Sequence, residues 1–348
     1  MERKVELPLE KFPPILTFNS HASYLSILFT VENYYKYFYS DFINIFSDSM
    51  SSVSGFIMER WYCDDMFFDM LILTSNENFA MTDCFGENVQ GIVLDLLRKD
   101  NLIKSIKLML SLGFYVSGRI NEFYVPKRRA EGRYDKRHDF YLNGYDDSEG
   151  CFYLSGYTSE GRYDIVNIPY ENFVRGLTLQ QKDCFNVLNF CKLKDYYSFE
   201  VDVKKIKMLL EDYISARCSF EKPSGIFKKD ISSFYFGTGV YDGLIKNTVK
   251  DNKRLDLRIF RMLLEHKSCM IKRFDVLAEE GICIDDSIKT KYQELVRLQA
   301  MVFNIAMKYK LKPSKELLEN ISQKSRYIKD EEMKLLEKVI SLLNQLAC

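Results

Sequence analysis

The residues best suited to acid–base chemistry in this sequence are its three histidines, His21, His138 and His266. Imidazole changes charge near neutral pH, so a histidine at the mouth of a strand can act as a general base. His138 opens an apolar run that ends at the turn residues 144–147, and a second apolar run covers 151–157. This pattern predicts a β-hairpin with His138 at the base of its first strand. A strand-end histidine with no catalytic role is the alternative.

The other two histidines have different surroundings. His21 follows Ser20 at the start of the apolar stretch 20–31, which predicts a buried helix whose N-terminus carries both residues. Ser20 is then either a helix cap or a nucleophile. His266 lies between charged residues in a long helical stretch, and this position predicts a side chain on the solvated face.

A basic loop precedes the histidine strand. Five of the seven residues 127–133 are charged, which is typical of a solvated loop. A functional alternative is that Arg128 and Arg129 form a guanidinium lip for a phosphate-bearing substrate, since guanidinium groups match phosphate oxygens. Tyr157, at the end of the second strand, is a further candidate substrate contact.

The order of the remaining elements predicts an α+β fold. Helices come first and antiparallel strands follow over residues 1–176, whereas residues 177–348 have an all-helical character. Expected helices cover 34–46, 88–98, 102–112, 201–217, 255–280, 287–310 and 331–346, and expected strands cover 67–73, 114–116, 121–125 and 162–168.

Composition narrows the function classes. The 348 residues are 47% hydrophobic, and Lys+Arg and Asp+Glu both number 49, so the net charge is zero. This balance argues against nucleic-acid and anionic-membrane partners. Nine cysteines without a Cys-x-x-Cys pair fit reduced thiols in a cytoplasmic protein better than disulfides or a zinc site. No phosphate-binding glycine loop or His-Glu-x-x-His motif appears, so neither a cofactor nor a metal is predicted.

The histidine strand carries a further pattern, because His138 is followed by Gly144, Tyr145 and Asp146 and then by a second strand. This spacing resembles the histidine strand of papain-like peptidases that cleave double-glycine leader peptides. A more specific likeness is to the peptidase-like proteins of antibiotic gene clusters, namely the butirosin side-chain acyltransferase and the amide-forming protease homologues of polythioamide assembly lines. The segments that carry this likeness are 122–126, 138–147, 152–153, 168–173, 239–242 and 265–267.

This resemblance implies both a fold and an activity. The fold would be a papain-like domain over residues 1–176, followed by a helical domain over residues 177–348. Relatives of this kind take an acyl group from a carrier-protein thioester, a phosphopantetheine-linked substrate, and pass it to an amine acceptor in antibiotic biosynthesis. The family's nucleophilic cysteine falls at Ser20, with His21 as the alternative register, and the family's base falls at His138.

Three positions depart from the family's pattern. Ser20 replaces the expected cysteine and is either native or an engineered substitution. The orienting aspartate is absent, which leaves Asp139 and Ser155 as candidates, and Pro14 and Ile15 occupy the region of the oxyanion glutamine. Two hypotheses remain: an acyltransferase, or a non-catalytic pseudoenzyme that binds a peptide, a carrier protein or an antibiotic. A monomer and a homodimer are both left open as oligomeric states.

Overall fold

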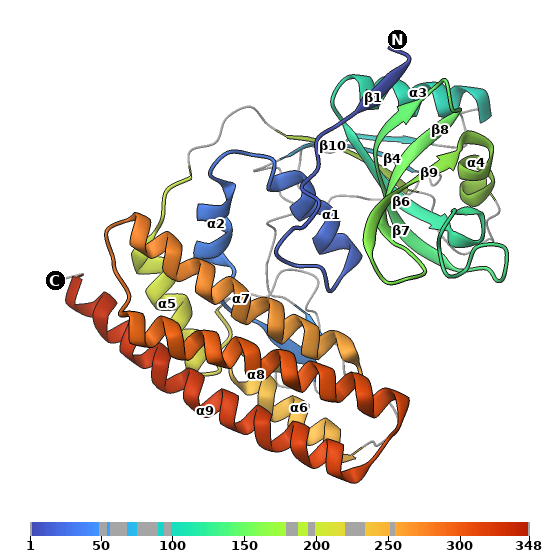
Figure 1. The fold of residues 1–348 in the computed structure, drawn as a ribbon. Coiled ribbons are helices and arrows are strands. Elements are labelled where there is room, and N and C mark those ends of the chain that lie inside the picture. Colours follow the sequence, from blue (N-terminus) through green and yellow to red (C-terminus); the bar gives the residue numbers. More distant parts are fainter. Residues whose placement is uncertain are drawn as a thin grey trace. The chain divides into compact units, whose positions relative to one another are not determined.

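The computed structural model describes residues 2–48, 54–55, 68–74, 90–93, 99–178, 187–193, 199–219, 234–250 and 255–346. The chain divides into two compact units. One, here called the sheet unit, comprises Met1–Glu32 and Arg60–Tyr197; the other, the helical unit, comprises Asn33–Glu59 and Ser198–Cys348. Figure 1 shows the strands of the sheet unit and the long helices of the helical unit.

The sheet unit contains an eight-stranded sheet with the order β5-β4-β10-β6-β7-β8-β9, and β1 pairs with β7. Neighbouring strands are antiparallel except for the parallel pair β4 and β5. The strands are β1 (Lys4–Glu6), β4 (Phe68–Thr74), β5 (Gln90–Val93), β6 (Tyr115–Asn121), β7 (Arg137–Asp146), β8 (Cys151–Tyr157), β9 (Tyr163–Pro169) and β10 (Val187–Leu193).

Helices pack on both faces of this sheet. On one face, α3 (Lys99–Ser111) and α4 (Tyr170–Thr178) cover an apolar core that includes Ile120, Phe140 and Leu154. On the other face, α1 (Asn19–Leu28) contacts β7 and β8. Because side chains alternate along a strand, each central strand contributes to both layers. The sheet therefore places α1 against β7, the strand that carries His138.

The β7–β8 hairpin is confirmed. Its two strands are antiparallel and pair from Tyr141 with Ser155 to Asp146 with Cys151. At Gly144 the register shifts, and the backbone of β1 comes so close that a Cβ there would lie 2.2 Å from the carbonyl oxygen of Val5. Glycine is required at this position because any other residue would push β1 away from β7.

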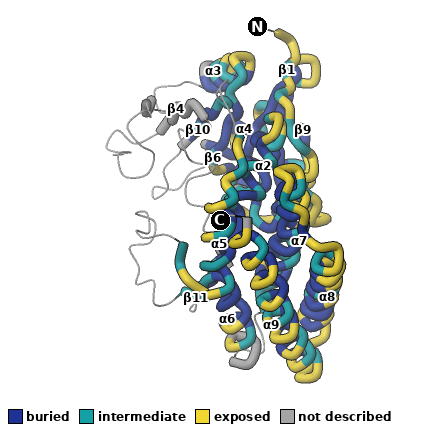
Figure 2. The backbone as a smooth tube through the Cα atoms, turned by 90° about the vertical axis from the view of Figure 1, so that its left-hand side faces the viewer, coloured by how far each residue is buried: buried dark blue, intermediate teal, exposed yellow. Residues whose placement is uncertain are grey.

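The helical unit consists of helices plus a three-stranded sheet of order β11-β2-β3. Side chains of Asp202, Asp256 and Asp285 accept hydrogen bonds from backbone N–H groups at the starts of α5, α7 and α8, respectively. Figure 2 shows buried residues along the inner sides of α7 and α8. The elements are α2 (Tyr34–Asp41), β2 (Phe46–Asp48), β3 (Ser54–Gly55), α5 (Val203–Ile214), β11 (Phe234–Phe236), α6 (Gly239–Lys250), α7 (Leu257–Glu279), α8 (Asp286–Leu311) and α9 (Lys315–Leu346).

A buried polar cluster lies inside the helical unit. Glu332 on α9 and Lys267 on α7 are both fully buried and form an ion pair of 2.5 Å. The hydroxyl of Tyr213 on α5 donates to Glu332 at 3.1 Å, and the hydroxyl of Tyr292 on α8 donates to the other carboxylate oxygen. One carboxylate thus connects side chains from three other helices.

His266 belongs to the same interior, so the prediction of a solvated side chain was wrong. It is fully buried, its Nε2–H donates to the carbonyl oxygen of Ile43 at 2.7 Å, and its ring stacks on Tyr213. Charged neighbours in the sequence suggested an exposed face, but Lys267 is itself buried against Glu332. The charged residues next to His266 in the sequence therefore gave no sign that its side chain is buried.

The mixed fold class is confirmed as an α and β protein with a mainly antiparallel sheet and a helical C-terminal region. Two predicted elements were wrong. Within the expected helix 88–98, residues Gln90–Val93 form β5, whereas 88–89 and 94–98 lie outside the described residues. Residues Glu122–Tyr124 of the expected strand 121–125 form a 3-10 helix, η2. None of the described helices combines the length and apolar character needed to cross a membrane.

The division into units does not follow a single cut in the sequence. The expected boundary between 176 and 177 differs from the observed one, because β10 pairs with both β4 and β6 and so belongs to the sheet unit. The early segment with α2 and β2 belongs to the helical unit, where α2 contacts α7 and β2 pairs with β11.

Candidate active site

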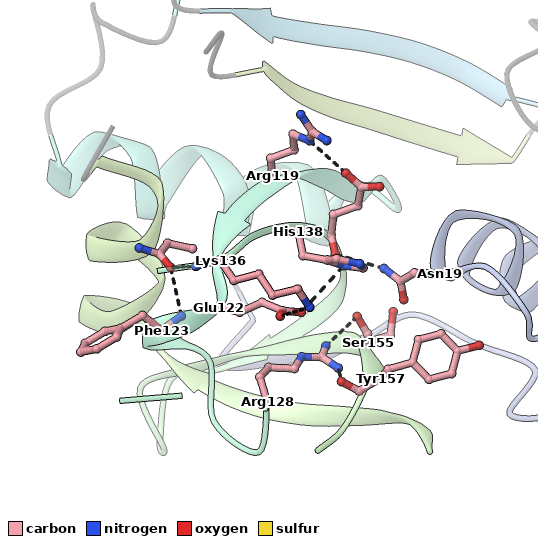
Figure 3. A network of polar contacts seen from close by, with 11 residues as sticks. Asn19, Arg119, Glu122, Phe123, Arg128, Lys136, His138, Ser155 and Tyr157 are labelled. Atoms are coloured by element: carbon pink, nitrogen blue, oxygen red, sulfur yellow. Dashed lines mark hydrogen bonds and ion pairs between the residues drawn. The ribbon is translucent and has the colours of Figure 1, made fainter. Parts of the chain in front are cut away.

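His138 lies at the open end of β7, beyond the last strand pair with β8. Its side chain starts on the face of its cross-strand partner Ile120, opposite to the face that α1 covers. The imidazole ring contacts the backbone of the next residue, since its Nδ1 lies 3.3 Å from the carbonyl oxygen of Asp139. The side chain is 38% exposed, so the imidazole is accessible to a substrate. Figure 3 shows this environment.

The start of α1 meets the same carbonyl group. Asn19, the first residue of α1, donates from Nδ2 to the carbonyl oxygen of Asp139 at 3.0 Å. One oxygen atom is therefore contacted by both the imidazole of His138 and the residue that precedes Ser20. The two predicted catalytic positions, 20 and 138, thus belong to chain segments that lie together.

The first turn of α1 is not capped by the side chain of its N-cap residue. Its N-cap residue is Phe18, and the first intrahelical bond runs from the N–H of Ala22 to the carbonyl oxygen of Phe18. Ser20 lies inside the first turn, so the alternative in which Ser20 is only the cap residue was wrong. Helix N-termini carry partial positive charge and N–H groups that can stabilise an oxyanion.

Glu122 is a site residue that sequence reasoning missed. Its Oε1 lies 3.8 Å from Nδ1 of His138, and its Oε2 accepts from Nζ of Lys136 at 2.8 Å. The side chain is only 9% exposed. Its backbone N–H donates to the carbonyl oxygen of Lys136, which ties η2 to the entry of the histidine strand. A carboxylate so placed favours a proton on Nδ1 and leaves Nε2 as the basic nitrogen.

The two candidates for the orienting group have other partners. The carboxylate of Asp139 accepts from Nε of Arg119 at 3.2 Å, and only its backbone carbonyl contacts His138. Ser155 is buried and hydrogen-bonds to the hydroxyl of Tyr163 at 3.3 Å, and Tyr163 in turn contacts Ser23 of α1 at 2.8 Å. Ser155 therefore belongs to the packing of α1 on the sheet.

The expected guanidinium lip does not include Arg128. This residue is 6% exposed, and its guanidinium donates to the carbonyl oxygens of Ser155 at 3.2 Å and of Tyr157. It thus ties the basic loop to β8 instead of facing a substrate phosphate. Arg129 is exposed, and the ring of Tyr157 makes an edge contact with Tyr163.

His21 is less suited to catalysis than His138. Burial lowers the pKa of the His21 imidazole to about 4, so its ring is neutral and a weak base at physiological pH. Its ring centroid lies 5.5 Å from that of Phe18 at the helix start.

No set of three or more His, Cys, Asp or Glu side chains in the described ranges is arranged to hold a metal ion. Compared with models of known protein families, the chain matches none. It also matches no curated protein sequence.

Proposed function

We propose that this protein transfers an acyl group from a thioester to an amine, with residue 20 as nucleophile and His138 as general base in a papain-like arrangement. The observation that supports this proposal most is the carbonyl oxygen of Asp139, which contacts both Nδ1 of His138 and Nδ2 of Asn19. This shared contact links the start of α1 to the strand that carries an accessible imidazole.

In the first half-reaction the hydroxyl of Ser20 gives its proton to Nε2 of His138 as its oxygen attacks the thioester carbonyl. The developing oxyanion is stabilised by N–H groups in the first turn of α1. The carbon–sulfur bond then breaks, the imidazolium returns its proton to the leaving thiolate, and an ester remains on Ser20. Glu122 stabilises the imidazolium during this step.

In the second half-reaction an amine attacks the ester, His138 removes a proton from the amine nitrogen, and that proton passes to the departing oxygen of Ser20. The products are an amide and the free enzyme. A serine can serve here because a thioester is already activated, so it demands less of the nucleophile than an amide bond would. The donor we expect is a carrier protein or another phosphopantetheine-linked acyl group, and the setting is antibiotic biosynthesis in the cytoplasm.

Covalent labelling tests the proposal. Incubation with an acyl thioester of N-acetylcysteamine, or with an acylated carrier protein, is expected to add one acyl group at residue 20. A Ser20→Cys protein should form the adduct faster, because a thiol near a helix N-terminus ionises more readily. His138→Ala should slow acylation by about 10²- to 10⁴-fold. Intact-mass measurement with peptide mapping gives the readout.

Ser20→Ala is the control for this labelling, because it should carry no adduct. If neither the wild-type protein nor Ser20→Cys becomes acylated, the acyltransferase proposal is overturned. A non-catalytic protein that binds a peptide, a carrier protein or an antibiotic would then be the better description.

The role of Glu122 gives a separate prediction. Glu122→Gln should lower the acylation rate constant by about tenfold or more at unchanged donor KM, because the imidazolium loses a neighbouring negative charge. Glu122→Asp should restore part of the rate. Lys136→Met is the matched control: it removes the other partner of Glu122 but leaves the carboxylate beside His138. Equal losses in Glu122→Gln and Lys136→Met would mean that Glu122 acts only by holding η2 in place.

A further inference from the structure

The loop of residues 127–137, between η2 and β7, carries a local surplus of positive charge. Six of its eleven residues are Lys or Arg and two are Asp or Glu, so its net charge is +4, whereas the whole chain has a net charge of zero. Arg128 is buried against β8, and Lys136 is paired with Glu122. The four remaining cations, here called the loop cations, are Lys127, Arg129, Arg133 and Arg137.

The loop cations have no carboxylate partner in the part of the chain that the structure describes. The two acidic residues of the loop are engaged elsewhere. Glu131 accepts the backbone N–H of Lys127 at 2.8 Å, and Asp135 accepts from Nδ2 of Asn121 at 2.8 Å. Three of the loop cations are exposed, and Arg137 is half-buried. They therefore form an accessible positive surface that attracts anions.

The backbone that carries the loop cations is tied to neighbouring elements at several points. The N–H of Gly132 donates to the carbonyl oxygen of Phe123 in η2 at 3.0 Å, and the carbonyl oxygen of Lys127 accepts from the N–H of Ser159 at 2.7 Å. Ala130 is fully buried. Because little backbone freedom would be lost on binding, these cations can bind an anion more tightly than cations on an untethered loop.

The same loop leads directly to the candidate general base. Arg137 pairs with Asn121 in the first position of β7 and immediately precedes His138. Nζ of Lys136 lies 2.8 Å from Oε2 of Glu122, and Oε1 of that carboxylate lies 3.8 Å from Nδ1 of His138 (Figure 3). The loop is therefore joined to the imidazole both along the chain and through side chains.

We propose that the loop cations bind the phosphate groups of the acyl donor, which makes the donor a thioester with phosphate on its pantetheine arm. This inference rests on the proposed acyl transfer. Guanidinium groups match phosphate oxygens with paired hydrogen bonds, and several cations suit a group with more than one negative charge. The arm between phosphate and thioester is long and flexible, so the two ends can bind at different places. The loop cations take no part in the covalent steps.

Calorimetric titration with coenzyme A tests this binding without requiring acyl transfer. Pantetheine is the comparison ligand, because it has the same thiol arm without phosphate. The wild-type protein should bind coenzyme A more tightly than pantetheine by about tenfold or more. In the double variant Arg129→Gln with Arg133→Gln, the Kd for coenzyme A should rise about tenfold, as expected for two exposed charge pairs. The Kd for pantetheine should not change, and added salt should weaken the binding of coenzyme A to the wild-type protein.

Arg3 and Lys104 provide a matched control. Both are exposed cations of the sheet unit without a carboxylate partner among the described residues. They lie near the opposite end of β7 from His138, since the carbonyl oxygen of Arg3 accepts from the N–H of Asp147, and Lys107 on the helix of Lys104 is paired with Asp147. Arg3→Gln with Lys104→Gln should leave the Kd for coenzyme A unchanged. An equal rise in this control would overturn the inference, because overall charge would then be responsible.

Two further binding results would overturn the inference. The first is a wild-type protein that does not bind coenzyme A, or a double variant that binds it as tightly as wild type. The second is inorganic pyrophosphate bound as tightly as coenzyme A, because the loop would then recognise phosphate alone and not a thioester donor.

Acylation kinetics, followed by intact mass, separate this inference from the proposed function. In the Arg129→Gln, Arg133→Gln variant, kcat/KM with acetyl-coenzyme A should fall about tenfold, whereas kcat/KM with the acetyl thioester of N-acetylcysteamine, which has no phosphate, should be unchanged. If both values are unchanged, phosphate recognition is overturned and acyl transfer stands. A loss only with an acylated carrier protein would also overturn it, because the loop cations would then contact the carrier's carboxylates. If the loop cations bind coenzyme A but no donor acylates residue 20, acyl transfer is overturned and only a phosphate site remains.

Discussion

Replacing Glu332 with glutamine is expected to lower the free energy of unfolding of the helical unit by about 3–5 kcal/mol. The carboxylate is fully buried and is the partner of Lys267, whose ammonium group is fully buried as well. After the substitution the ammonium would remain inside without a counter-charge. Glutamine has nearly the same volume as glutamate and keeps one acceptor oxygen for a tyrosine hydroxyl. The loss of stability would therefore come from the missing negative charge and not from a cavity.

Several observations show how strongly this pair is enclosed. Burial lowers the pKa of Lys267, whereas the nearby Lys267 ammonium and the Tyr292 hydroxyl keep the pKa of Glu332 below its usual value despite burial. The ammonium of Lys267 also lies 5.1 Å from the ring centroid of Tyr241. We expect the charged form of the pair to persist in the folded protein, because each charge is the main compensation for the other.

Urea unfolding followed by far-UV circular dichroism measures this effect, since α5 to α9 all belong to the helical unit. The control is the double variant Lys267→Met with Glu332→Gln, which removes both charges together. It should recover at least half of the stability lost in the single Glu332→Gln variant, because no unpaired charge stays buried. A single variant within about 1 kcal/mol of wild type, as for an exposed ion pair, would contradict this account.

The sequence predicted those helices and strands that are specified by residues close together in the chain. The hairpin of β7 and β8 was found because alternation and a turn of small and acidic residues specify it without help from distant segments. The helices α3, α5, α7 and α8 were found because their apolar residues recur at helical spacing. The strand β5 was mistaken for a helix because its short apolar segment gains strand character from pairing with β4, a partner that the local sequence does not show.

The interior of the helical unit was less predictable for the same physical reason. Lys267 and Glu332 are 65 positions apart, and either one alone is typical of a solvated helix face. Only the packing of α7 against the other helices brings them together inside. His266 was assigned to the surface because its neighbours are charged, and the error followed directly from not knowing that Lys267 has a buried partner.

The role of the candidate site stays a prediction, but two of its chain segments were named from the sequence. His138 and the start of α1 were identified from spacing and resemblance, and the structure brings their chain segments together through Asp139. Glu122 was missed because it precedes His138 by 16 positions across the basic loop. The signal that could have found it is the pairing of β6 with β7, in which Ile120 faces His138 and so places the next acidic residue beside the imidazole.

Acid is expected to destabilise the helical unit well above the pH at which carboxylates titrate. Burial lowers the pKa of His266 to about 3, from an ordinary value near 6.5 in the unfolded chain. The unfolded chain therefore binds a proton below pH 6.5 that the folded unit does not, and stability falls with decreasing pH. Between pH 6.5 and 5 the loss amounts to about 1.6 kcal/mol, because the unfolded histidine is already half protonated at pH 6.5 and the full slope of about 1.4 kcal/mol for each pH unit is reached only below it.

The charged groups that face His266 determine whether other titrations contribute to the loss of stability between pH 6.5 and 5. The negative Glu332 favours a protonated imidazole, whereas the ammonium of Lys267 and the guanidinium of Arg273 oppose it, and burial is the largest effect. The pKa of Glu332 is below its usual value of 4.5, so its own contribution is present above pH 4.5 and is lost only below it. The loss of stability of the helical unit between pH 6.5 and 5 is therefore expected to come from His266.

His266→Gln is the variant for this test, because a glutamine amide can still donate to the carbonyl oxygen of Ile43 but does not titrate. Urea unfolding of the helical unit at pH 6.5, 6.0, 5.5 and 5.0 should show the loss in the wild-type protein and a nearly flat response in the variant. His21→Gln is the matched control, since burial also lowers the pKa of His21, but His21 belongs to the sheet unit. If the wild-type and His266→Gln proteins lose stability in parallel over this range, His266 is protonated as readily in the folded chain as in the unfolded one, and its position in a closed interior would be wrong.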